Sequence, residues 1–100
     1  MEMPFLSHVE ERWNALRLQA RCTTARSTLT RPQPCHLRIA IETHEARASV
    51  TAHEALRTLD IVVHRFKDDR TLAEGPCASN ADADRRLQRL YIDLTASPFA

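Results

Sequence analysis

A change of hydrophobic period along the chain constrains its fold more than any other sequence feature. At both ends the apolar residues recur every three or four positions, whereas over residues 36–43, 46–53 and 58–64 they alternate with polar or small ones. Alternation is typical of a β-strand with one face turned to a core, because successive strand side chains point to opposite faces. We therefore predict a middle section of strands between two helices.

Two tight turns give the predicted strands a consistent register. The first turn sets Ile39 opposite Val50 and Glu42 opposite Arg47, an attractive pair that contributes about 0.2–1 kcal/mol. The next turn sets Val50 opposite Ile61. Both turns leave the large apolar residues on one face, and a slip of one residue would turn that set to water. The pattern therefore indicates an antiparallel meander.

The two ends are predicted to be amphipathic helices. Over residues 4–20 the apolar stripe consists of Leu6, Val9, Trp13, Leu16 and Ala20. Over residues 80–95 it consists of Ala83, Leu87, Leu90, Tyr91 and Leu94. Ser79 and Asp82 have the spacing of a capping box, which favours a helix start between them.

The remaining segments complete one domain. Strands are expected over residues 22–30, 36–44, 46–53, 58–66 and 70–74, with a polar turn over residues 67–69 and a loose tail over residues 96–100. Because 100 residues leave no room for two cores, we predict one α+β domain over residues 1–100. Its architecture is an antiparallel meander of four or five strands with both helices packed on one face.

A long helix over residues 45–66 is the competing interpretation of the middle section. Its apolar stripe would contain Ala48, Ala52 and Leu59, but it would leave Val50 and Ile61 outside. The β-branched run at residues 61–63 also disfavours a helix. The strand interpretation accounts for more of the pattern.

Charge and composition narrow the classes of function. The formal net charge is +1 and aromatic residues are 5% of the chain, which disfavours a nucleic-acid platform of cationic and stacking side chains. No apolar run approaches the roughly 20 residues of a membrane span, and the N-terminus lacks the order of a signal peptide. We therefore expect a cytoplasmic protein that binds neither nucleic acid nor membrane. Its three cysteines, an odd number without a zinc-ribbon spacing, are expected to be reduced thiols.

The polar face of the predicted sheet offers little for catalysis. Gly75 is the single glycine, so a glycine-rich phosphate loop is excluded. His36 and His53 are predicted cross-strand neighbours, with Cβ atoms about 5 Å apart, and two imidazoles so placed suit a metal if a third donor joins them. No thiol or carboxylate is expected beside them, because Glu54 lies in the turn. We therefore interpret them as solvated surface histidines, and we expect no enzymatic activity, metal or cofactor.

The order of elements resembles the TriTu-type immunity proteins of bacterial polymorphic toxin systems. The resemblance covers nearly the whole chain as a succession of elements. It consists of an amphipathic helix over residues 5–20, a polar strand, the strands "HLRIAIET", "ARASVTAH" and "LDIVVHRF", and a closing helix from "NADADRRLQRL". This resemblance implies a cytoplasmic antidote that binds an ADP-ribosyltransferase toxin acting on elongation factor Tu and occludes its cleft.

A protein partner would recognise the polar face of the sheet through charge complementarity. The residues expected to contact it are Arg38, Glu42, Arg47, Thr51, His53, Asp60 and His64. Two alternatives remain open at this point. One is a homodimeric structural or adaptor module whose sheet pairs with itself, and the other is a small metal-binding regulatory protein that uses His36 and His53.

Overall fold

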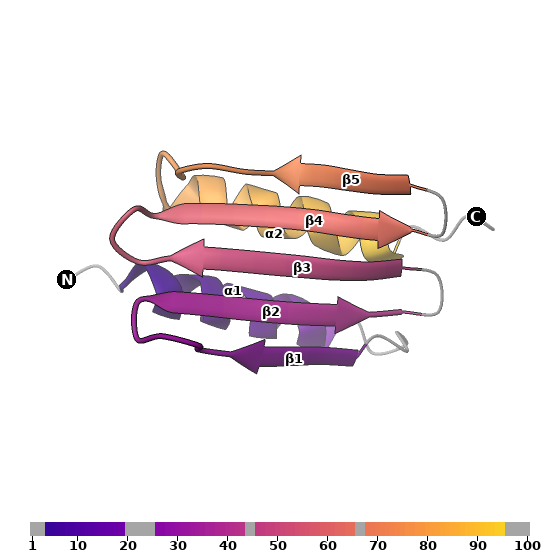
Figure 1. Ribbon diagram of the computed structural model, residues 1–100, viewed down its shortest axis with the longest axis horizontal. Coiled ribbons are helices and arrows are strands. Elements are labelled where there is room, and N and C mark those ends of the chain that lie inside the picture. Colours follow the sequence, from indigo (N-terminus) through magenta and orange to yellow (C-terminus); the bar gives the residue numbers. More distant parts are fainter. Residues whose placement is uncertain (1–3, 20–25, 44–45, 66–67, 96–100) are drawn as a thin grey trace.

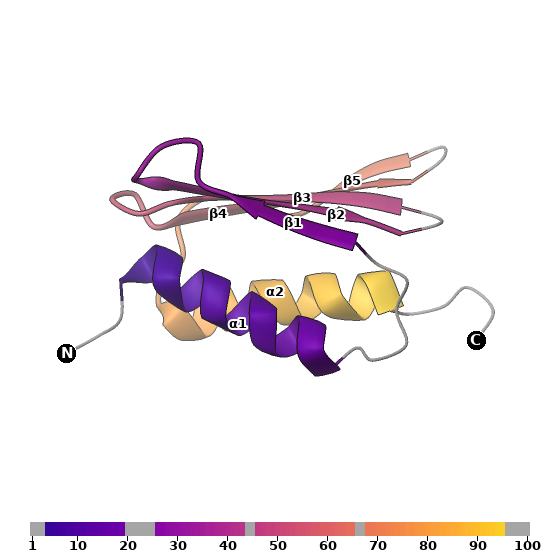
Figure 2. The same ribbon diagram turned by 90° about the horizontal axis from the view of Figure 1, so that it is seen from below.

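A five-stranded antiparallel sheet with two helices on one of its faces makes up the computed structural model, which describes residues 4–19, 26–43, 46–65 and 68–95 (Figures 1 and 2). The elements in chain order are α1 (Phe5–Gln19), β1 (Arg26–Thr30), β2 (His36–Glu42), β3 (Ala46–His53), β4 (Thr58–Arg65), β5 (Asp68–Ala73) and α2 (Asn80–Thr95). Each strand pairs with its neighbour in sequence. The predicted α+β meander is confirmed, and the long-helix alternative is wrong.

The register of the three central strands is the one that the sequence predicts. Ile39 pairs with Val50, Val50 pairs with Ile61, and Glu42 pairs with Arg47. Along β2 and β3 the burial alternates residue by residue, with the apolar side chains buried. The register is fixed because only this pairing puts all of these apolar side chains on one face.

The fifth strand begins earlier than predicted. Asp68 and Asp69 were expected in a turn, but they lie in β5 and pair with Arg65 and His64. The His64 ring nitrogen Nδ1 lies 2.9 Å from an Asp69 carboxylate oxygen, and this contact supports the extra pairing. A bulge opposite Ile61 and Val62 then shifts the register of β5, and its extra residue, Leu72, is buried.

Several predicted details lie outside the described residues. They are Ala20 of the first apolar stripe, residues 22–25 of the first predicted strand, residue 44, residues 66–67 and the tail over residues 96–100.

The core lies between the sheet and the two helices. The predicted stripe residues of α1, from Leu6 to Leu16, are each at most 5% exposed, and Leu87 and Leu90 of α2 are fully buried. On the buried face of β3, Ala48 and Ala52 flank Val50 with small side chains, so that α1, which contacts this strand, can approach the sheet closely. The helices lie side by side (Figure 2), and a His8 ring nitrogen lies 2.8 Å from an Asp84 carboxylate oxygen across 76 residues of sequence.

The turn between β3 and β4 holds the start of α1. Glu54 Oε2 accepts a hydrogen bond from the Leu6 amide at 2.7 Å, which satisfies one of the free N–H groups of the first helical turn. The Arg57 guanidinium lies 5.7 Å from the centre of the Phe5 ring, within the range of a cation–π contact. The cap of this helix therefore comes from a residue 48 positions away in the sequence.

The start of α2 is capped locally, as predicted. Ser79 Oγ accepts a hydrogen bond from the Asp82 amide, and Asp82 Oδ2 accepts one from the Ala78 amide at 3.0 Å. The bond from Ala78 holds the pKa of Asp82 below its ordinary value of 3.8. Arg86, one turn further along, donates hydrogen bonds to the carbonyl groups of Leu59 and Gly75 and so fastens α2 to the end of the sheet.

Replacement of Ile39 by alanine tests the one-sided core. Ile39 is fully buried, so Ile39→Ala should lower the free energy of unfolding by about 2–5 kcal/mol. Arg38→Ala, at the next position on the exposed face, should change it by less than about 0.5 kcal/mol. Urea unfolding measures both values, and equal losses would contradict the assignment of faces.

Replacement of Asp82 by asparagine tests the helix cap. Because the folded-state pKa of Asp82 lies below 3.8, the ionised carboxylate stabilises the fold above about pH 4, and this contribution is lost as pH falls through the folded-state pKa. Asp82→Asn should therefore melt at a lower temperature than the parent at neutral pH. The difference should shrink below pH 3.8, and a difference that stays constant down to pH 2 would show that the charge is not involved.

Candidate functional site

One face of the sheet is left uncovered by the helices. Both helices lie on the same side of the sheet, and no described element covers the other side (Figure 2). We call this side the open face. It carries the side chains that alternate with the buried ones along β2, β3 and β4. The strands hold these side chains on a hydrogen-bonded backbone, so their relative positions are fixed before any partner binds.

All seven residues predicted to contact a partner lie on the open face. Cross-strand pairing aligns Arg38, Thr51 and Asp60 in one row. It aligns Glu42, Arg47 and His64 in a second row, to which Asp69 of β5 is added. His53 lies at the end of β3 opposite His36.

These seven side chains differ in how far the protein itself engages them. Arg47 Nε lies 3.1 Å from a Glu42 carboxylate oxygen, and both side chains are more than half exposed. Asp60 Oδ1 accepts a hydrogen bond from the Gly75 amide at 2.8 Å, so this carboxylate also positions the connection between β5 and α2. The Arg38 side chain is exposed and makes no ion pair or hydrogen bond with another residue of the described segments. Among these seven residues, Arg38 is therefore the arginine whose charge has no partner within the described segments.

A row of small, uncharged side chains runs between the two charged rows. Its members, in order across the sheet from β1 to β5, are Thr28, Ala40, Ser49, Val62 and Thr71. We call it the neutral row. The neutral row with charged rows on both sides resembles the composition of a protein–protein interface. In such an interface, charged residues are depleted from the core and found at the rim.

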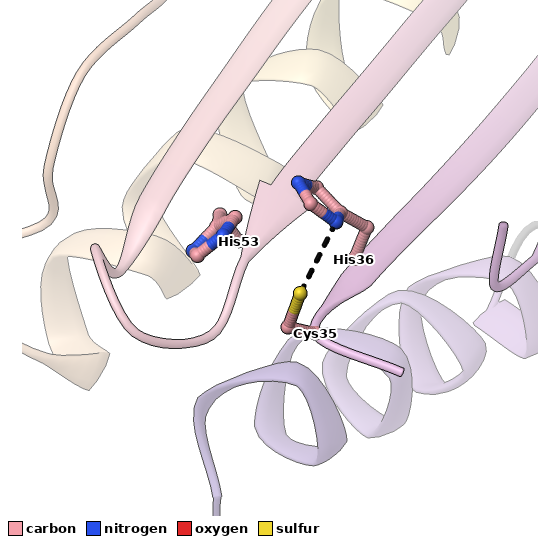
Figure 3. A group of neighbouring side chains, drawn as sticks. All are labelled: Cys35, His36 and His53. Atoms are coloured by element: carbon pink, nitrogen blue, oxygen red, sulfur yellow. Dashed lines mark hydrogen bonds between the residues drawn. The ribbon is translucent and has the colours of Figure 1, made fainter. Parts of the chain in front are cut away.

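A second group of candidate side chains lies where β2 begins and β3 ends. Cys35, His36 and His53 each contribute one potential ligand atom, and these atoms all lie within 4.8 Å of one another (Figure 3). Cys35 Sγ lies 3.3 Å from His36 Nδ1, and the two imidazole centroids are 4.4 Å apart in an edge-to-face arrangement. We call these residues the Cys35–His36–His53 cluster.

The histidine pair lies as the sequence predicts, but its surroundings differ from the prediction. The register confirms His36 opposite His53, whereas the expectation that no thiol lies beside them is wrong. Cys35 precedes the first residue of β2, and the turn there brings its Sγ to the side of the His36 ring. The sequence does contain a signal, a cysteine directly before a predicted strand histidine. Its side-chain direction, however, depends on a turn conformation that alternation does not specify.

The other features that could support chemistry are engaged in the fold. Burial raises the pKa of the Cys77 thiol, which favours its protonated form and lowers its reactivity. A depression of about 340 Å³ between α2 and β5 is lined by arginines including Arg85, Arg86 and Arg89, but Asp82 and Glu74 lie among them and Arg86 is bonded to backbone carbonyl groups. The two carboxylates therefore offset most of the positive charge of this depression.

No family model, curated protein or solved structure matches this chain. Among the described residues, neither helix combines the length and the apolar character needed to cross a membrane. The assignment of a function therefore depends on the open face and the cluster.

Thiol labelling separates the two described cysteines. Cys35 is half-buried at the sheet end, whereas Cys77 is buried and has a raised pKa. In the native protein at pH 8, iodoacetamide should alkylate Cys35 faster than Cys77, since only the thiolate reacts and the reagent must reach it. Peptide mass mapping over a time course measures the two rates. Comparable rates in the folded state, with both thiols equally reactive after denaturation, would contradict the described packing of Cys77.

Proposed function

We propose that this protein is a stoichiometric inhibitor of the immunity type, which docks its open face on a partner protein and performs no chemistry of its own. The observation that carries this proposal is the separation of the sheet into two unlike faces. Except for Ala40 and Val62 of the neutral row, the apolar residues of β2, β3 and β4 are buried under the helices, and the mixed-charge residues are held on a rigid surface that no described element covers.

The charges of the open face favour a protein partner whose surface carries both positive and negative charges. Arg47 pairs with Glu42 on the adjacent strand, and Arg38 and Asp60 lie on either side of Thr51, so cations and carboxylates are mixed over a short distance. A polyanion such as nucleic acid would meet repulsion at each carboxylate, whereas a folded protein can place the opposite charge at each point. The neutral row between them leaves space for an apolar side chain that projects from the partner.

A toxin is the class of partner that the family resemblance favours. The order of elements that resembles TriTu-type immunity proteins implies an ADP-ribosyltransferase toxin that modifies elongation factor Tu. An antidote of this kind acts in the cytoplasm by covering the cleft of the toxin, and it needs neither a cofactor nor a catalytic group. A rigid sheet suits this task, because few side chains must be ordered when the complex forms.

A charge reversal at Arg38 tests whether the open face is the binding surface. Arg38→Glu removes no ion pair within the described segments, so the fold should be retained while the charge presented to the partner is inverted. We expect at least a tenfold weaker complex, which corresponds to about 1.4 kcal/mol, with the proposed ADP-ribosyltransferase toxin domain. Surface plasmon resonance measures the affinity, and growth on co-expression measures the protection.

Arg89→Glu is the matched control for this experiment. Arg89 is exposed on α2, on the other side of the molecule, and its reversal changes the net charge by the same amount. It should leave the affinity within about twofold, since a distant surface charge contributes little at physiological salt. Equal effects of the two reversals, or no effect of Arg38→Glu, would remove the open face from the proposal. A chain that sediments as a dimer and binds no toxin would favour the homodimeric module instead.

A further inference from the structure

We propose that the Cys35–His36–His53 cluster is a zinc-binding site. Three residues that the meander places at one end of the sheet bring a thiol sulfur and two imidazole nitrogens within 4.8 Å of one another (Figure 3). This inference is independent of the proposed function, because it concerns the affinity of the chain for a metal ion whether or not the open face binds a protein.

The spacing of the ligand atoms is close to that of a tetrahedral zinc site. Zn–S bonds of about 2.3 Å and Zn–N bonds of about 2.0–2.1 Å, at a tetrahedral angle, separate sulfur from nitrogen by about 3.6 Å. The observed separation of Cys35 Sγ and His36 Nδ1 is 3.3 Å. The third ligand atom lies within 4.8 Å of both, so closure of the site needs a side-chain movement of about 1 Å and no change of the sheet.

The backbone fixes the three residues relative to one another. His36 and His53 are paired across β2 and β3, and the Cys35 carbonyl accepts a hydrogen bond from the Glu54 amide at 2.9 Å. The strand pairing and this hydrogen bond therefore hold the backbone of all three cluster residues in place. The ligands are therefore already assembled when the metal arrives, and little conformational entropy is lost on binding.

The donor set selects the metal. One thiolate and two imidazoles form a borderline-soft set that suits zinc better than the hard cations, which prefer oxygen. Three protein ligands leave one tetrahedral position for water, the arrangement of zinc sites that remain open. All three residues are half-buried, so they are shielded from bulk solvent without being closed to an ion.

Zinc binding has a consequence for the neighbouring turn. His53 Nδ1 accepts a hydrogen bond from the Leu56 amide at 3.2 Å. A neutral imidazole has one nitrogen with a free lone pair, so His53 cannot bind zinc and accept this bond together. If Nδ1 binds the metal, the metal replaces the amide, and if Nε2 binds it, Nδ1 carries a proton. Either way, zinc releases the Leu56 amide.

Calorimetric titration of the full chain with zinc chloride tests the site. The parent should bind one equivalent of zinc through the cluster. Each of three single substitutions should weaken that binding by about 100-fold or more: Cys35→Ser, His36→Gln and His53→Gln. This magnitude is expected because loss of even a residue that contacts the metal indirectly lowers the affinity by about 10–100-fold. His64→Gln is the matched control, because His64 is also an imidazole on the open face but lies outside the cluster. It should bind zinc as the parent does.

Two further readouts distinguish this site from adventitious binding. With cobalt in place of zinc, a sulfur-to-metal absorption band should appear in the parent and be absent in Cys35→Ser. Hydrogen exchange of the Leu56 amide should become faster when zinc is added. The inference is overturned if the parent takes up no zinc, if the three variants bind it as tightly as the parent, or if the Leu56 amide does not respond.

Discussion

One-sided burial of the sheet is the constraint on which the rest of this structure depends. Ile39, Val50 and Ile61 lie side by side across three strands and are fully enclosed beneath the helices. Their burial removes apolar surface from water, which is the main favourable contribution to folding. It also fixes the register, and the register decides which polar side chains meet on the other side. The charged rows and the neutral row of the open face are therefore consequences of how the core is packed.

One end of the sheet carries most of the polar contacts that position the helices. Glu54 binds the first turn of α1, and Asp60 and Arg86 hold the connection that leads into α2. The Cys35–His36–His53 cluster lies at the same end, where β2 begins and β3 ends. A ligand bound there would act on a part of the molecule that several side-chain contacts already order.

The sequence predicted the fold where two independent requirements agreed. In the central strands, alternation and turn length gave the same pairing, and α2 had both an apolar stripe and a local cap at Ser79. Prediction was less complete where a single local feature decided the outcome. The start of β5 depends on the contact between His64 and Asp69, and the bulge beside Val62 has no counterpart in a pattern of alternation.

The candidate sites also contain one part that the sequence predicted and one part that it did not. Placement of Arg38 and Glu42 on the open face followed from the strand period alone. The approach of Cys35 to His36 did not, because a side chain in a turn follows the turn geometry.

The pairing of the two helices joins the first and last elements of the described chain. His8 of α1 contacts Asp84 of α2, while every strand between them pairs only with its sequence neighbours. The sheet can therefore assemble from successive hairpins, but its apolar face is covered only when the first and last helices are both present. A fragment that lacks either helix would present a flat hydrophobic sheet to water, and such a surface is prone to aggregate. The helical layer thus makes the domain indivisible, although the sheet beneath it is built from local pieces.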